Sequence, residues 1–219
     1  MITALLLDFD GTIVDSETAE AEAWAVVYAE HGHELDRGAV ARGAGHIETQ
    51  GAPGRRLAAL LGDDTLTETL MAQWYAQFVE CVVAEEIRPG ILAWLEEARA
   101  MGWRTAVASS SSRDWVVPHL DRLGLLADLD TVVCGDEVER TKPAPDVYLL
   151  ALRRLGVDAG TAIAVEDSVH GATAAEVAGC HVVVTPNPMT LQQDWPAHFD
   201  HVDLATLTLR DLAARLERA

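Results

Sequence analysis

The chain contains short segments that are almost continuously apolar and rich in β-branched residues, and these predict buried strands. Parallel strands covered by helices on both faces have this character, because neither face meets water. Between these segments, apolar residues recur with the period of a helix, and glycines stand where helix ends need them. The alternation predicts an α/β protein with a parallel sheet. Strands are expected at residues 2–7, 104–108, 131–134, 162–165 and 181–184, and helices at 91–101, 113–123, 145–155, 171–178 and 209–218.

One long segment between the first two predicted strands interrupts this alternation and reads mainly as helix. It contains the stretches EAEAWAVVYAEHG, RRLAALLG and TETLMAQWYAQFVECVVA. A structureless loop of this length is unusual in a compact domain, so we expect an inserted helical subdomain over the carboxyl end of the first strand. Pro89 and Gly90 mark the return to the core. The predicted boundaries are 1–15 and 86–219 for the core and 16–85 for the helical insertion.

Two aspartates follow the first predicted strand directly. Asp8 and Asp10 belong to the string DFDGTIVDSE. Aspartates are depleted in strands and costly to bury unpaired, so the pair needs a compensating cation or a chemical use. Gly11 suits a tight turn and leaves room for a ligand to approach the backbone. A bare D-x-D could also be an Asx turn, but the longer string favours a catalytic site that holds a divalent metal ion.

Polar residues with complementary chemistry follow three further predicted strands. Ligands of open parallel sheets bind outside the carboxyl ends of the strands, so these residues should meet there. The second strand leads to the serine run 109–112, the third to Lys142, and the fourth to Glu166 and Asp167. Carboxylates suit a metal ion, whereas hydroxyls, backbone N–H groups and an ammonium suit phosphate oxygens. The strand ends therefore predict a site for a metal ion and a phosphate group.

Each of these motifs has a simpler interpretation when it is taken alone. A serine run after a strand is commonly a plain loop, Asp-Ser commonly forms a helix N-cap, and a lysine is commonly solvated. Lys142 is, however, the only lysine among the 219 residues. A compact ammonium suits a point-charge site that a planar guanidinium does not. The convergence of the motifs at one edge of the sheet favours the functional interpretation.

Composition excludes several classes of partner. The formal net charge of -19 argues against nucleic acid and anionic membranes, so a phosphorylated substrate needs a local positive site. The three cysteines show no C-x-x-C spacing, which argues against a disulfide framework or a zinc site. The chain starts without a basic leader, and no apolar run reaches about 18 residues. We expect a cytoplasmic, monomeric protein with a small-molecule partner.

The ordered motifs resemble those of the haloacid dehalogenase superfamily, in the subgroup with a helical cap after the first strand. The resemblance implies a Rossmann-like core, a Mg²⁺ ion, and phosphoryl transfer through an aspartyl-phosphate. It also implies a role for each matching residue. Asp8 is the nucleophile and a metal ligand, Asp10 is the general acid/base with its carbonyl on the metal, Asp167 is a metal ligand with Glu166 beside it, and Ser109, Ser110 and Lys142 bind the phosphoryl group.

Within the superfamily, the pattern is similar to β-phosphoglucomutase and to related sugar-phosphate phosphatases. The mutase resemblance implies a cap histidine soon after the first motif, where this chain has Glu20, and a cap arginine that falls near His46. Both departures favour a phosphatase of sugar or polyol phosphates, with the mutase as the alternative. A phosphate-binding protein without turnover is disfavoured, because no member of the catalytic set is missing. The expected specificity residues are Glu20, Arg42, Gly43 and His46, although a glycine-rich hinge would also explain the last three.

Overall fold

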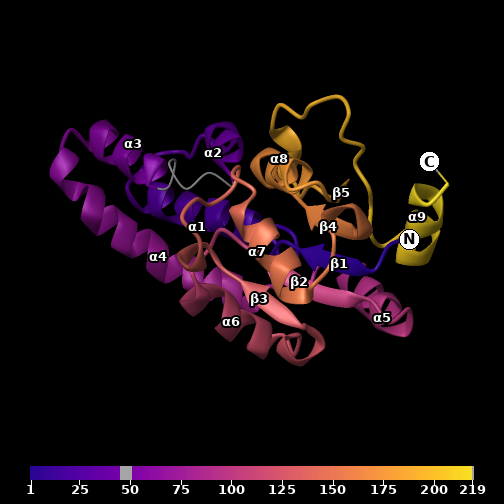
Figure 1. The fold of residues 1–219 in the computed structure, drawn as a ribbon. Coiled ribbons are helices and arrows are strands. Elements are labelled where there is room, and N and C mark those ends of the chain that lie inside the picture. The colour runs from indigo at the N-terminus through magenta and orange to yellow at the C-terminus, as the bar shows by residue number, and fades with distance from the viewer. Residues whose placement is uncertain (45–50, 219) are drawn as a thin grey trace.

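A computed structural model describes residues 1–44 and 51–218, and within them a five-stranded parallel sheet forms the centre (Figure 1). The strand order is β3-β2-β1-β4-β5, so β1 lies in the middle and the chain moves outward from it in both directions. The prediction of a Rossmann-like α/β fold is confirmed. The strands are β1 (Ala4–Leu7), β2 (Arg104–Ala108), β3 (Thr131–Val133), β4 (Ala162–Glu166) and β5 (His181–Val184).

The two faces of β1 are buried in separate apolar clusters, which explains its uninterrupted apolar sequence. Leu5 and Leu7 pack in one cluster with α5, α6 and α9, while Ala4 and Leu6 pack in the other with α7 and α8. Successive side chains of a strand point to opposite faces, so each face takes alternate residues. These helices are α5 (Ile91–Ala100), α6 (Arg113–Arg122), α7 (Asp146–Leu155), α8 (Val169–Val177) and α9 (Leu209–Leu216).

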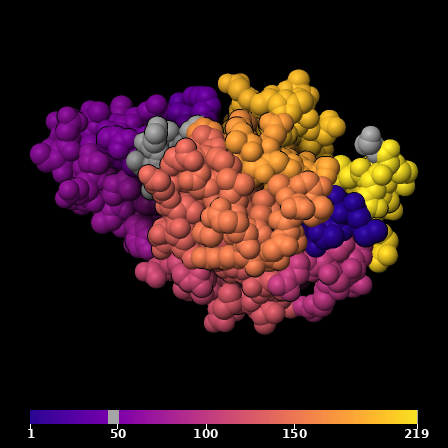
Figure 2. Space-filling model, in the orientation of Figure 1, coloured from indigo at the N-terminus to yellow at the C-terminus, as the bar shows by residue number. Residues whose placement is uncertain are grey.

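The described residues of the helical insertion contain four α-helices between β1 and α5, gathered at one end of the sheet (Figure 1). In the space-filling view it forms a lobe beside the body that contains the sheet (Figure 2). Trp24, Tyr28, Leu57 and Leu70 are buried in an apolar cluster of its own. The helices are α1 (Ser16–Glu30), α2 (Arg37–Gly43), α3 (Ala52–Leu61) and α4 (Thr67–Ala84).

Two local differences from the predicted elements have clear causes. Helix α8 begins at Val169 rather than at residue 171, because the Ser168 side chain caps it by accepting a hydrogen bond from the Gly171 N–H at 3.2 Å. Helix α2 was not predicted as a separate element, although Asp36 caps it in the same way through the Ala39 N–H. None of the helices in the described ranges is long and apolar enough to cross a membrane.

The register of the sheet brings the strand ends together. Leu7 lies opposite Val107 of β2 on one side and Val165 of β4 on the other. The chain therefore leaves these three neighbouring strands at the same level, and the Asp8 N–H continues the ladder by donating to the Val165 carbonyl at 3.0 Å. The strand order reverses at β1, which is the point where open α/β sheets bind ligands.

Candidate active site

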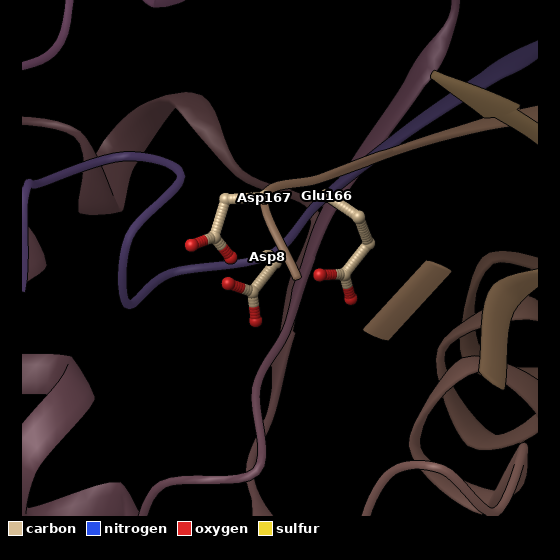
Figure 3. A group of neighbouring side chains, drawn as sticks. All are labelled: Asp8, Glu166 and Asp167. Atoms are coloured by element: carbon tan, nitrogen blue, oxygen red, sulfur yellow. The ribbon is translucent and has the colours of Figure 1, made fainter. Parts of the chain in front are cut away.

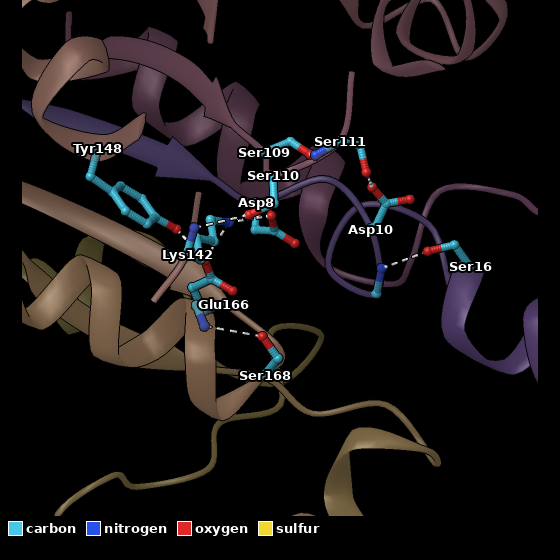
Figure 4. Close-up of polar contacts among 12 residues, drawn as sticks. Asp8, Asp10, Ser16, Ser109, Ser110, Ser111, Lys142, Tyr148, Glu166 and Ser168 are labelled. Atoms are coloured by element: carbon cyan, nitrogen blue, oxygen red, sulfur yellow. Dashed lines mark hydrogen bonds and ion pairs between the residues drawn. The ribbon is translucent and has the colours of Figure 1, made fainter. Parts of the chain in front are cut away.

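Lys142 lies between two carboxylates at the carboxyl end of β1 (Figure 4). Its Nζ is 2.5 Å from Asp8 Oδ1 and 2.6 Å from Glu166 Oε1, and all three side chains are almost fully buried. The Tyr148 hydroxyl, from α7, donates a hydrogen bond to Glu166 Oε1. Lys142 Nζ also lies 5.1 Å from the centroid of the Tyr148 ring. The lone lysine of the sequence is thus buried and in contact with two of the carboxylates at this edge of the sheet.

The charges of this group are unbalanced. Burial opposes the charge of Lys142, but Asp8 and Glu166 outweigh that effect and raise the pKa of the ammonium. Burial raises the pKa of Asp8, and it raises the pKa of Glu166 to about 7, in both cases against the opposing charge of Lys142. One cation cannot neutralise two carboxylates. An additional cation would therefore stabilise the ionised site.

Asp167 adds a third carboxylate and completes a candidate metal site (Figure 3). One carboxylate oxygen from each of Asp8, Glu166 and Asp167 lies within 4.8 Å of the others. Burial, followed by the charges of Asp8 and Glu166, raises the pKa of Asp167 well above its usual range. Glu166 Oε2 is buried without a hydrogen-bond partner among the described residues. An oxygen-rich set with excess negative charge fits Mg²⁺.

The backbone at Gly11 lies against this cluster. Gly11 has a φ of +76°, and a Cβ built there would lie 2.0 Å from Asp167 Oδ2. Only glycine therefore allows the turn and the close approach of the aspartate. Asn187 Nδ2 donates to the same Asp167 oxygen at 2.8 Å, and the Arg88 guanidinium donates to the Gly11 carbonyl. These contacts hold the Asp167 carboxylate beside the end of β1.

The Asp10 side chain lies apart from the three clustered carboxylates. Ser111 Oγ donates to Asp10 Oδ2 at 2.6 Å, and the Trp115 indole Nε1–H donates to Oδ1 at 2.9 Å. Both carboxylate oxygens are thus directed toward the loop after β2 and the start of α6. The cluster of Asp8, Glu166 and Asp167 does not include the Asp10 side chain. The predicted metal contact of Asp10 therefore rests on its backbone carbonyl alone.

The serine run after β2 forms one wall of the site. The Ser109 N–H donates to the Val133 carbonyl at 3.0 Å, and Ser109 Oγ accepts from the Ser111 N–H at 3.0 Å. Ser110 Oγ accepts from the Lys142 N–H at 3.3 Å. The run is therefore held to β3 on one side and to the lysine loop on the other. The structure brings Ser109 and Ser110 to the same cavity as Asp8.

A cavity of about 750 Å³ extends from Asp8 to the helical insertion. Glu20, Arg42 and Gly43 line it, whereas His46 lies outside the described residues. The aromatic part of its lining comes mainly from α4 and includes Trp74. Trp24 and Trp94 are fully buried, as expected for core residues, but Trp74 both packs in the insertion and borders the cavity.

Glu20 makes a testable contribution to the pH dependence of stability. Burial and the charge of Asp10 raise its pKa from 4.5 to about 7. Between these values the folded protein keeps a proton that the unfolded chain has lost, so the free energy of unfolding falls as pH rises through this window. Glu20→Gln should remove this loss and stabilise the protein at pH 8 relative to pH 5, by about 1 kcal/mol after allowance for partial exposure.

Urea denaturation at the two pH values measures this effect, with Glu22→Gln as the control on the same helix. Glu22 is exposed, and its hydrogen bond with Arg37 lowers its pKa. The control should therefore lose a little stability to a similar extent at both pH values, because Glu22 is mostly ionised in the folded and the unfolded protein at pH 5 and at pH 8. A Glu20→Gln gain that is equal at both pH values would contradict the assigned burial effect.

Several residues of the site were not predicted from the sequence. Tyr148, Asn187, Arg88, Ser111 and Trp115 each contact a predicted residue through a hydrogen bond. Ser111 was within the predicted run, but nothing distinguished it from its neighbours. The other four lie in helices or loops where their residue types are ordinary. No local signal in the sequence identifies them.

Comparison with known proteins identifies the family of the chain. Residues 2–179 match the family model of the haloacid dehalogenase-like hydrolases. The chain is 37% identical over 190 residues to YhcW of Bacillus subtilis (strain 168), covering 87% of this chain and 86% of that protein. It is 29% identical over 184 residues to the fructose-1-phosphate phosphatase YqaB of Escherichia coli (strain K12), covering 82% of this chain and 94% of that protein. The structure of β-phosphoglucomutase from Clostridium difficile matches with a TM-score of 0.75 and 19% identity, covering 100% of this chain and 98% of that one.

The family match covers most of the chain, so the protein belongs to the haloacid dehalogenase-like hydrolases. The family predicted from the four sequence motifs is confirmed. At 19% identity, the likeness to β-phosphoglucomutase shows the fold alone. The choice between hydrolysis and phosphoryl return to a sugar therefore depends on the residues around the cavity.

Proposed function

We propose that this phosphatase is a Mg²⁺-dependent hydrolase of small phosphate monoesters, with sugar or polyol phosphates as the main class, and that it acts through an aspartyl-phosphate on Asp8. The observation that carries the proposal is the Asp8 carboxylate, which lines the cavity 2.5 Å from the ammonium of Lys142 and beside Asp167. A phosphate group in the cavity would meet a nucleophile and a cation at the same place. The family assignment supports this chemistry.

In the first step, a carboxylate oxygen of Asp8 forms a bond to phosphorus as the bond from phosphorus to the ester oxygen breaks. Asp10 gives a proton to the departing alcohol. In the second step, Asp10 takes a proton from water as the water oxygen attacks phosphorus. The bond between phosphorus and Asp8 breaks, which releases phosphate and restores the carboxylate.

The remaining residues bind and neutralise the phosphoryl group. Lys142, Ser109 and Ser110 are the proposed ligands of its oxygens, because all three border the cavity next to Asp8. Asp8 and Asp167, with Glu166 nearby and the Asp10 carbonyl, are the proposed holders of Mg²⁺. When bound, the ion would reduce the repulsion between Asp8 and the phosphate and stabilise the charge that develops in transfer.

The helical insertion at residues 16–85 is proposed to act as a cap over a core of residues 1–15 and 86–219. Most of the residues that line the cavity belong to the insertion, so its side chains would contact the alcohol part of the substrate. Glu20, Arg42 and Gly43 are the candidates for specificity, together with His46. The sugar-phosphate class is supported by the 29% identity to a fructose-1-phosphate phosphatase.

A phosphosugar mutase is the second candidate, because the fold is shared with β-phosphoglucomutase. A mutase must exclude water and return the phosphoryl group to a sugar. Glu20 stands where the mutase resemblance implies a histidine, and this departure favours the hydrolase. The Glu20 carboxyl group borders the cavity, and the charge of Asp10 helps to raise its pKa. Binding without turnover is disfavoured, since the nucleophile, the acid/base and the phosphate ligands are all present.

The proposal is tested by phosphate release from a panel of sugar, polyol and nucleotide monophosphates, each measured with Mg²⁺ and with chelator. The panel includes β-glucose 1-phosphate with a bisphosphate primer. We expect release that depends on Mg²⁺, falls at least about 100-fold with chelator, and is fastest for sugar or polyol esters. Formation of glucose 6-phosphate without release would instead establish the mutase. No reaction of any ester would leave only a binding protein.

A further inference from the structure

Trp115 connects the proposed acid/base to the helical insertion. Its indole Nε1–H donates to Asp10 Oδ1 at 2.9 Å, and its ring stacks on Phe78 of α4 with a centroid separation of 5.3 Å and an angle of 18°. The ring of His119 also contacts Trp115, with a centroid separation of 4.4 Å and a tilt of 56°. Trp115 is therefore in contact with the proposed catalytic carboxylate and with the insertion at the same time.

The stack continues into the centre of the insertion. Phe78 stacks on Trp74 at 5.2 Å and 10°, and Trp74 stacks on Trp24 of α1 at 5.4 Å and 9°. Trp24 is fully buried and Trp74 nearly so. A row of four rings thus runs from the core of the insertion to Asp10. Aromatic pairs prefer particular separations and orientations, so each ring of the row restricts the position of the next.

We infer that Trp115 is a positioning residue that orients the Asp10 carboxylate and makes this orientation depend on the place of α4. The inference rests on the proposed function, in which Asp10 transfers the proton. Ser111 holds one carboxylate oxygen, and a single hydrogen bond leaves the group free to turn about it. The indole N–H holds the second oxygen and fixes the plane of the carboxylate. The ring itself is fixed by Phe78.

The proposed role predicts a loss that depends on the leaving group. An alkyl phosphate needs a proton on its departing oxygen, so a misplaced Asp10 should slow its transfer to Asp8. The 4-nitrophenolate ion leaves without a proton. In Trp115→Phe, which keeps a stacking ring and removes the donor, kcat/KM for a sugar or polyol phosphate should fall at least about tenfold. For 4-nitrophenyl phosphate, kcat/KM should change less than about threefold, because transfer of its phosphoryl group to Asp8 needs no proton from Asp10.

Trp195→Phe is the matched control. The Trp195 indole also donates a hydrogen bond, to the Thr190 carbonyl at 2.9 Å, but Trp195 is not among the residues that line the cavity. This variant should leave both values of kcat/KM unchanged. Equal losses on the two esters in Trp115→Phe would indicate a structural role only and would overturn the inference, as would no loss on either ester.

Phe78→Leu tests the connection to the insertion, with Tyr75→Leu as its control. Tyr75 also lies on α4 and borders the cavity, but it contacts Trp74 rather than Trp115. Phe78→Leu should reproduce the leaving-group dependence to a smaller degree, and Tyr75→Leu should not. A Phe78→Leu variant without this dependence would contradict the link to α4. If the proposed function is wrong, the unmodified protein will hydrolyse neither ester. This result is distinct from a failure of the inference about Trp115, in which the unmodified protein is active.

Discussion

Replacing Asp8 by Asn is expected to reduce phosphate release by about 10⁴-fold or more while the protein stays folded. The amide keeps the shape of the side chain but is too weak a nucleophile to form the bond to phosphorus. The fold should tolerate the change, because burial already disfavours a charged Asp8 and raises its pKa in the folded protein. Lys142 also keeps Glu166 as a partner, 2.6 Å from its Nζ.

The measurement is the rate of phosphate release from the best substrate of the panel, with Mg²⁺, alongside a thermal melt of each variant. Asp15→Asn is the matched control, because Asp15 caps α1 through the Thr18 N–H and is not among the residues that line the cavity. It should keep most of the activity. Substantial turnover by Asp8→Asn would remove Asp8 from the role of nucleophile. Mass spectrometry should also find one added phosphoryl group on the Asp8 peptide of the active protein.

Replacing Lys142 by Met is expected to lower both activity and stability. Activity should fall about 10³-fold, because the phosphoryl group loses its nearest cation. Removing one partner of a buried ion pair leaves an uncompensated charge and costs about 3 kcal/mol or more. The loss of stability in Lys142→Met should be larger at pH 8 than at pH 5. Lys142 lowers the pKa of Asp8 and Glu166 against the effect of burial, so without it both carboxyls take up protons more readily as the pH falls.

Urea denaturation of the Mg²⁺-free proteins at both pH values measures this loss. The double variant Lys142→Met, Glu166→Gln removes the cation and one of its carboxylates, so it should recover stability at pH 8 without recovering activity. Arg140→Met is the surface control: Arg140 pairs with Asp146 at 2.8 Å, but the guanidinium is 68% exposed and its removal should change stability little. A Lys142→Met loss that is the same at both pH values would show that the two carboxylates do not depend on the lysine.

The apolar segments of the chain are sufficient to predict the sheet and the edge at which the site lies. Segments such as Ala4–Leu7 and residues 162–165 are apolar without interruption, and this local property requires burial on both faces. Once the strands are parallel, their carboxyl ends meet at one edge, so Asp8, Lys142 and Asp167 could be placed together from their positions after the strands. These features depend on neighbours in the chain or on a general rule of topology.

Which groups contact one another at that edge depends on the packing of the folded chain and could not be predicted. Asp10 belongs to the same motif as Asp8, yet its side chain turns to Ser111 and Trp115, while Glu166 joins the acidic group and pairs with Lys142. Such contacts join residues far apart in the chain, such as Lys142 and Asp8, which are separated by 134 positions, and their geometry is set by how helices pack on the sheet. A hydrogen bond needs a particular distance and direction, which the identity of a residue does not specify. The sequence determined which chemical groups reach the site, and packing determined how each of them is oriented.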